Sequence, residues 1–165
     1  MKKLPVIIFV FLLLIVSIGV FYSHLFFLFF VKDHQLVKLS LKESFFSQTK
    51  KEMLVEVVKT EKSIAGGLSS RPSMQTSDAK QIDGMLFFFP KKDILKFWMK
   101  DMQFNLDICW LSNMNFLACT RNTSSLEGDR ENKVYSSPSF ANLVLETKPG
   151  ELSDSDLKSK LFFKW

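Results

Sequence analysis

The chain has 165 residues, of which 47% are hydrophobic, and a formal net charge of +5. This length allows one domain with a core of its own and little more. Lys2 and Lys3 contribute two of the net positive charges, and the other charges are interspersed without a basic block. Such a mild and dispersed charge argues against a nucleic-acid partner.

The first 31 residues are strongly apolar, and no charged residue occurs between Leu4 and Val31. A helix of this length exceeds the roughly 30 Å hydrocarbon core of a bilayer. We therefore predict a single N-terminal transmembrane helix within residues 1–31, with residues 4–31 contacting the lipid bilayer. A cleaved signal peptide is the alternative, because Ser17-Ile18-Gly19 has the small-x-small pattern of a cleavage site. The length of the apolar run favours an uncleaved anchor.

Residues 32–51 mix lysine, serine and glutamine with scattered apolar side chains. They predict a juxtamembrane linker, either a polar tether or an amphipathic segment lying on the bilayer. Lysines occur on both sides of the apolar run, so their distribution does not settle the orientation of the anchor. Residues 52–165 are predicted to form one β-rich globular domain.

The predicted domain begins near Glu52 with a β-branched strand over residues 53–60. Thr60 is expected to cap a short helix over residues 61–68 that ends at Gly66 and Gly67, and residues 69–83 form a polar loop. The apolar stretch 84–111 is interrupted by polar residues, so no piece of it is long enough to span a membrane. It predicts core strands at 84–89, 95–100 and 104–111.

A hairpin is predicted over residues 108–120, with its turn at 112–115. A three-residue loop that ends on Asn115 would place Ser112 opposite Phe116. The same register places Cys109 directly opposite Cys119, where a disulfide is feasible.

A polar loop is expected at 122–133, a strand at 142–147, a helical turn within 153–160 and a last strand at 161–165. The fold class predicted from these elements is mainly β, a compact β-sandwich or distorted barrel with one or two short helices.

The predicted domain contains no histidine, because His24 lies in the anchor and His34 lies beside it. This excludes Ser-His-Asp and Cys-His mechanisms from the domain. Two cysteines alone do not complete a structural zinc site, and no glycine-rich phosphate loop is present. The Ser-x-x-Lys spacings at Ser47 and Ser155 occur in polar segments and are interpreted as coincidence. We therefore expect no metal and no cofactor, and enzymatic activity is not the favoured interpretation.

Lys100 and Asp107 are charged residues placed among core strands. We predict that Arg71, Lys100 and Asp107 converge on one rim that suits a charged ligand. A structural ion-pair set that holds strands together is the alternative. Trp98 and Trp110 are interpreted as core residues rather than as a ligand platform.

Several short motifs occur in a characteristic order: Gly67-Leu68, Arg71, DGMLFFFP at 83–90, FWMK at 97–100, LDI at 106–108, Tyr135 and VLE at 144–146. In this order they resemble the bacterial and archaeal domain-of-unknown-function family 192, over about Leu54 to Gly150. The resemblance implies a compact β-sandwich or distorted barrel and export or membrane anchoring, but no activity. It also implies a shared candidate binding surface made of Arg71, Trp98, Lys100, Asp107, Tyr135 and Glu146.

The chain departs from the family pattern at Asp101-Met102 and Asn105, and it lacks the proline-rich segment expected before Tyr135 and a closing Gly-Asp. We expect these departures to affect loops rather than the fold. The favoured function is a binding or accessory module of the cell envelope, anchored in the cytoplasmic membrane, with its domain outside and an unknown envelope ligand or protein as partner. Two alternatives remain, an enzyme that uses carboxylate, lysine or tyrosine chemistry, and a structural or interaction protein.

Overall fold

The computed structural model describes residue 11 and residues 27–124 and 133–164. The chain divides into two compact units, Met1–Val31 and Lys32–Trp165. The predicted anchor and the predicted cleavage site lie almost entirely outside the described residues. Among the residues that are described, no helix is both long and apolar enough to cross a bilayer.

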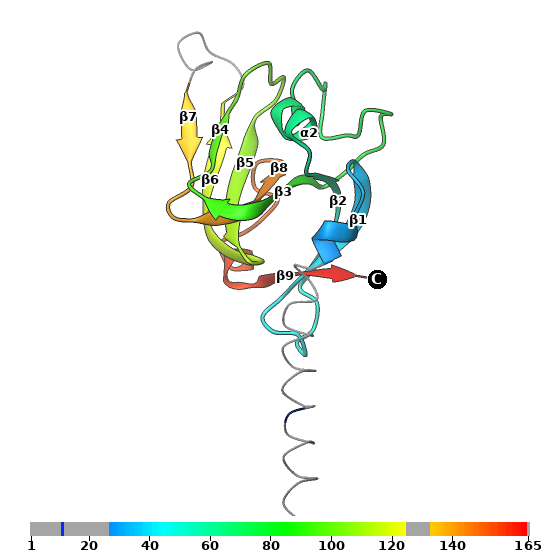
Figure 1. The fold of residues 1–165 in the computed structure, drawn as a ribbon, viewed down its shortest axis with the longest axis vertical. Helices are drawn as coiled ribbons and strands as arrows, with labels where there is room; N and C mark the ends of the chain where they lie inside the picture. The colour runs from blue at the N-terminus through cyan, green and yellow to red at the C-terminus, as the bar shows by residue number, and fades with distance from the viewer. Residues whose placement is uncertain (1–10, 12–26, 125–132, 165) are drawn as a thin grey trace, which may run out of the picture. The chain divides into compact units, whose positions relative to one another are not determined.

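The second unit is built on one strongly curved sheet (Figure 1). Its strands are hydrogen-bonded in the order β1-β2-β3-β8-β5-β6-β9. Their bounds are Gln35–Lys42 for β1, Lys51–Val58 for β2, Gly84–Asp93 for β3, Leu106–Ser112 for β5, Asn115–Thr123 for β6, Ala141–Thr147 for β8 and Lys160–Lys164 for β9. β4 (Lys96–Trp98) and β7 (Val134–Ser136) form a separate two-stranded ribbon. The described residues also contain two short helices, α2 (Glu61–Gly66) and the 3-10 helix η2 (Asp156–Lys158).

The ring of strands closes through a single register pair, Asn115 of β6 with Lys160 of β9. The sheet is therefore distorted, and it is neither a regular barrel nor a pair of stacked sheets. The prediction of a mainly β domain with one or two short helices is confirmed. The strands predicted at 53–60, 84–89, 95–100, 104–111, 142–147 and 161–165 correspond to β2, β3, β4, β5, β8 and β9.

Residues 35–42, predicted as part of a linker, form strand β1 instead. β1 pairs antiparallel with β2 on one side and with β9 on the other. Val37, Leu39 and Leu41 are buried, which is the alternation expected of a strand that covers a core with one face. The prediction of a linker over residues 32–51 is therefore wrong for this segment, and the compact unit begins at Lys32 rather than at residue 52.

Strands β2 and β3 are parallel neighbours, so the chain must cross over between them. Helix α2 lies in this crossover. Thr60 caps it as predicted: its Oγ1 accepts a hydrogen bond from the Ser63 backbone N–H, and the Ser63 Oγ accepts one from the Thr60 N–H. The helix ends at Gly66, and Gly67 adopts a φ of +47°, a backbone conformation that favours glycine.

The hairpin of β5 and β6 has the predicted cysteine register but a different turn. Asn113 and Met114, both with positive φ, form a two-residue turn that pairs Ser112 with Asn115, so the predicted three-residue loop is wrong. An irregularity in β6 then adds one residue between the Leu111–Phe116 pair and the Trp110–Ala118 pair. The two differences cancel, and Cys109 faces Cys119, to which it is joined by a disulfide.

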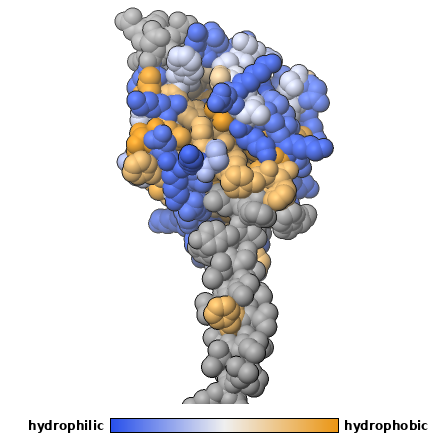
Figure 2. Space-filling view, in the orientation of Figure 1, coloured by the Kyte–Doolittle hydropathy of each residue, from blue (hydrophilic) through white to orange (hydrophobic). Residues whose placement is uncertain are grey.

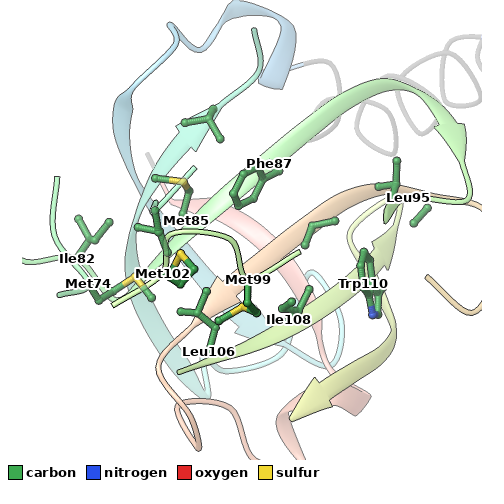
Figure 3. Packing of buried hydrophobic residues seen from close by; sticks show 14 residues of the cluster. Met74, Ile82, Met85, Phe87, Leu95, Met99, Met102, Leu106, Ile108 and Trp110 are labelled. Atoms are coloured by element: carbon green, nitrogen blue, oxygen red, sulfur yellow. The ribbon is translucent and has the colours of Figure 1, made fainter. Parts of the chain in front are cut away.

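One apolar cluster fills the space between the sheet, α2 and the ribbon (Figure 3). Methionines from three segments of the chain meet in it: Met74, Met85, and the pair Met99 and Met102. Phe97 of the ribbon contacts the ring of Phe87 at a centroid distance of 4.9 Å and that of Trp110 at 5.6 Å, both edge to face. These contacts attach the ribbon to the sheet.

Gly84, the glycine of the GMLF motif, lies where β3 passes against β8. A Cβ atom at this position would lie 2.7 Å from the backbone oxygen of Glu146. We expect Gly84→Ala to lower the free energy of unfolding by about 1–3 kcal/mol, because one of the two strands must shift. Urea denaturation of both proteins measures the difference. Gly66→Ala is the matched control, since an added Cβ there meets nothing within 4 Å; equal effects at the two glycines would contradict the steric explanation.

Candidate functional site

A pocket of about 180 Å³ opens where the end of α2, strand β3 and the ribbon meet above β8. Its wall is mainly apolar and aromatic, with two ionisable side chains, Lys96 and Glu146. The lining residues are Ile64, Ala65, Gly66, Gly67, Leu68, Ser69, Phe87, Phe89, Leu95, Lys96, Phe97, Trp98, Met102 and Glu146. An apolar concavity with few polar groups is the usual form of a small-molecule site.

Glu146 is the buried ionisable residue of this pocket, with only 4% of its surface exposed. It lies on the central strand β8, between Met85 of β3 and Ile108 of β5. Among the described residues no hydrogen bond or ion pair reaches its carboxyl group. Burial raises the pKa of Glu146 to about 8. The carboxyl group is therefore mainly protonated at neutral pH, and it can donate a hydrogen bond.

The mouth of the pocket carries aromatic and basic side chains. Trp98 is 52% exposed, and the Lys100 Nζ lies 5.5 Å from the centroid of its ring, in a cation–π arrangement. The interpretation of Trp98 as a core residue is therefore wrong, whereas Trp110 is buried as expected. Tyr135 of β7 pairs with Phe97 of β4, and its ring lies 5.1 Å from the Lys133 Nζ. Tyr135 thus supports the ribbon that forms one wall of the pocket.

Arg71 belongs to a different cluster. Its guanidinium donates to both carboxylate oxygens of Glu56, at 2.6 and 3.2 Å, and to the Gln75 backbone oxygen at 2.5 Å. Glu56 is buried in β2, and its Oε1 also lies 2.6 Å from the Nδ1 of His34. The Glu56 carboxylate is therefore held by two cationic or donor groups, a structural pairing typical of a buried acid.

Glu56 and His34 were missed in the sequence. Glu56 lies inside the predicted strand that became β2, and it was not recognised there as a buried charged residue. His34 was assigned to the region beside the anchor. The structure places His34 in the domain, where its backbone N–H donates to Val57. The prediction that the domain contains no histidine is therefore wrong.

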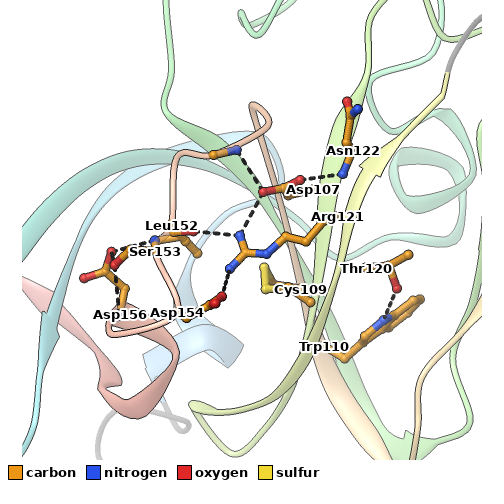
Figure 4. The surroundings of a disulfide bond; sticks show 12 residues. Asp107, Cys109, Trp110, Thr120, Arg121, Asn122, Leu152, Ser153, Asp154 and Asp156 are labelled. Carbon is orange, nitrogen blue, oxygen red and sulfur yellow. Dashed lines mark hydrogen bonds and ion pairs between the residues drawn. A yellow bond between two sulfur atoms is a disulfide. The ribbon is translucent and has the colours of Figure 1, made fainter.

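Asp107 forms the centre of a third cluster beside the disulfide (Figure 4). It is fully buried, and its carboxylate accepts hydrogen bonds from the Arg121 guanidinium at 2.9 Å and from the backbone N–H groups of Asn122 and Gly150 at 2.7 and 3.0 Å. Arg121 also donates to the Leu152 backbone oxygen and to Asp154. Asp107 therefore joins β5, β6 and the turn after β8, and this role is structural.

The six predicted surface residues thus separate into groups. Trp98 and Glu146 line one pocket, and Lys100 and Tyr135 lie at or behind its wall. Arg71 and Asp107 have partners elsewhere, the buried Glu56 and the partly exposed Arg121. The predicted convergence of Arg71, Lys100 and Asp107 is wrong, because each has different partners. The described part of the chain also shows no group of three or more His, Cys, Asp or Glu side chains suited to a metal ion.

Comparison with known families gives a match over residues 44–160 to DUF192, described as an uncharacterized ACR. The chain belongs to the DUF192 family. The match covers most of the chain and includes the pocket, Glu146, Asp107 and the disulfide. The DUF192 family itself has no assigned activity, so membership establishes no reaction.

Two solved structures share the fold. One is a protein of Sinorhizobium meliloti, proposed to be a transcription regulator, with 18% identity, a TM-score of 0.63, and coverage of 81% of this chain and 97% of that one. The other is a protein of unknown function from Novosphingobium aromaticivorans, with 20% identity, a TM-score of 0.61, and coverage of 82% and 89%. At these identities the likeness concerns the fold alone. No curated protein matches the chain.

Proposed function

We propose that this DUF192 domain is a binding module for a small, largely apolar ligand. The observation that carries the proposal is the pocket between α2, β3 and the ribbon, which holds the carboxyl group of Glu146, a group without a partner in the described part of the chain. A buried polar group without a partner lowers stability, and a bound ligand that pairs with it would recover that free energy.

Binding is favoured over catalysis because the pocket offers one carboxyl group and not a pair. General acid–base chemistry on two carboxylates needs a second acid in reach of the same substrate. The other ionisable residue of the wall, Lys96, is exposed, and no ion pair joins it to Glu146. An enzyme that uses the single acid remains the second candidate, supported by the raised pKa of Glu146.

The surface gives less support to a purely structural or interaction protein. The face seen in Figure 2 carries hydrophilic and hydrophobic side chains side by side. Among the described residues of the domain, the exposed large apolar side chains are those of Phe45, Phe46, Ile94, Trp98, Leu117, Val134 and Phe140. Ile94, Trp98, Val134 and Phe140 lie in or near the ribbon, and Trp98 also lines the pocket.

The proposal includes a location. The apolar run over residues 4–31 would anchor the chain in the cytoplasmic membrane and present the domain outside it. The Cys109–Cys119 pair supports this location, because disulfides persist mainly in oxidising compartments.

A thiol assay in native cells tests the location. We expect both cysteines of the acid-quenched, denatured protein to react with a maleimide polymer only after reduction. Two free thiols before reduction would contradict an extracytoplasmic domain. The Cys109→Ser, Cys119→Ser double variant is the control for the mass shift, and a topology reporter fused after Trp165 gives an independent answer.

A fragment screen tests the binding proposal. The full chain in detergent micelles is titrated with small aromatic compounds, and the methyl resonances of Ile64, Leu68 and Met102 are followed by NMR. We expect compounds that bind to shift these pocket methyls and to lose binding in Gly66→Phe, which adds a ring at the pocket wall. Lys62→Phe adds the same ring to an exposed position of α2 outside the pocket and should leave binding intact. Binding that shifts other methyls, or that survives Gly66→Phe, would contradict the proposal.

A further inference from the structure

We propose that the pocket selects an uncharged ligand that presents a hydrogen-bond acceptor to Glu146, on an apolar body about the size of one aromatic ring. This inference rests on the proposed binding function and names the chemical class of ligand. It follows from the polar groups, the charges and the dimensions of the pocket.

Of the polar side chains that line the pocket, one is buried without a hydrogen-bond partner among the described residues. Ser69 donates its hydroxyl hydrogen to the Lys100 backbone oxygen, and Lys96 is exposed to solvent at the mouth. Glu146 is buried and has no partner for its carboxyl group among the described residues. The groups beside it on the neighbouring strands, Met85 of β3 and Ile108 of β5, offer no hydrogen bond of useful strength. A carbonyl or other acceptor of the ligand would therefore complete the site.

The charges at the mouth disfavour a cationic ligand. Lys96 and Lys100 both carry positive charge near the entrance, and Lys100 lies over the ring of Trp98, where a ligand cation would otherwise bind. Lys96 is the other titratable residue that lines the pocket, and α2 and the loop to Ser69 contribute none. An anionic ligand would be buried against apolar rings and an acid, without a buried cation to pair with it. An uncharged ligand meets neither obstacle.

The dimensions suit a single ring. An apolar cavity of about 150 Å³ is large enough for benzene, and this pocket measures about 180 Å³. Phe87, Phe89 and Phe97 form its aromatic wall, in which Phe97 stands edge to face with both of the others. Rings packed in this way present apolar surface of defined shape, so a flat ligand of similar size would fit against them.

Four probes of nearly the same size separate the ligand classes. Acetophenone carries an uncharged acceptor, α-methylstyrene has the same shape without the acceptor, benzylamine is a cation and benzoate an anion. Each is titrated by NMR into the full chain in detergent micelles at pH 6.5, with free probe concentrations measured. We expect acetophenone to bind about tenfold or more tightly than α-methylstyrene, the discrimination typical of one buried hydrogen bond, and more tightly than either ion.

Variants of Glu146 attribute the preference to its carboxyl group. Glu146→Gln retains a donor and should keep the preference for acetophenone, at pH 6.5 and at pH 9.5. In the unsubstituted protein the preference should weaken at pH 9.5, where the carboxyl group loses its proton. Glu146→Leu should bind both neutral probes equally.

The outcomes distinguish this inference from the binding function. Equal binding of acetophenone and α-methylstyrene to the unsubstituted protein would overturn the ligand class and leave the pocket as a binding site. Tightest binding of benzylamine or benzoate would also overturn the class. If none of the four probes shifts the pocket methyls, both the inference and the proposed function are wrong.

Discussion

Replacing Glu146 by leucine is expected to stabilise the protein increasingly as the pH rises. The unfolded chain ionises this carboxyl group near pH 4.5, whereas burial raises the pKa of Glu146 in the folded protein to about 8. Below pH 4.5 both states are protonated and the group has no effect. Between these two values only the unfolded state releases the proton, so the free energy of unfolding falls as the pH rises, and the loss is complete above pH 8.

The expected size of this effect is large. At about 1.4 kcal/mol per pH unit, the loss accumulates to the order of 5 kcal/mol by pH 8.5. We expect the unfolding free energy of Glu146→Leu, measured by urea denaturation, to differ little from that of the unsubstituted protein at pH 4 and to exceed it by several kcal/mol at pH 8.5. Glu61→Leu, at an exposed position of α2, is the control and should show no such trend. A difference for Glu146→Leu that does not change with pH would mean that the carboxyl group is ionised or paired in the folded protein.

Removing the Asp107 carboxylate is expected to have the opposite effect at neutral pH. The Asp107→Ala change leaves the Arg121 guanidinium without its buried partner and leaves the backbone N–H groups of Asn122 and Gly150 without an acceptor. Arg121 is 34% exposed and keeps its bonds to Leu152 and Asp154, so the main cost comes from the two backbone donors, at about 1–3 kcal/mol for each donor left without an acceptor. We expect a loss of this size in the free energy of unfolding at pH 7, measured by urea denaturation. Asp107→Asn, which keeps the volume and one acceptor oxygen, should lose less.

The other carboxylate on Arg121 provides the matched control. Asp154 also accepts a hydrogen bond from this guanidinium at 2.9 Å, but its side chain is 95% exposed. An exposed pair contributes about 1 kcal/mol or less, so Asp154→Ala should be nearly neutral. Comparable losses for Asp107→Ala and Asp154→Ala would show that burial of Asp107 does not determine the strength of its pairing.

The strands of the fold could be predicted largely from local patterns, and the errors have physical causes. The β5–β6 hairpin was expected to turn at Asn115, the residue type most tolerant of positive φ. Asn113 and Met114 take that conformation instead, and the extra residue in β6 restores the register. A methionine is an unusual choice for such a turn, and it is accommodated because its side chain is buried.

Strand β1 shows where composition misled. Its lysines and serine suggested a solvated linker, although Val37, Leu39 and Leu41 alternate as in a strand. The buried Ser40 lies on the opposite face, where its hydroxyl group donates to the Phe162 backbone oxygen of β9. The partner strand lies so far along the chain that no local pattern indicates the pairing.

The candidate site was only partly predictable for the same reason. Trp98 and Glu146 were singled out through the family resemblance, but the pocket arises where the end of α2, β3, β4 and β8 meet. The partners of Arg71 and Asp107 come from other parts of the chain, Glu56 from β2 and Arg121 from β6. Of the two charged residues noted among core strands, Asp107 forms a structural ion pair, whereas Lys100 is exposed beside the Trp98 ring. The identity of each partner depended on the tertiary structure.

The pairing of β1 with β9 has a consequence for synthesis. Ser40 and Phe162, which meet across this pair, are 122 positions apart in the chain. As the protein is made, β1 emerges early and one of its edges stays unpaired until Leu161 and Phe163 can pack into the core. Contacts between such distant segments make folding slow, and an open strand edge can pair with another chain in the meantime. This nascent chain is therefore expected to be most prone to aggregation, and most in need of a chaperone, just before its last strand is added.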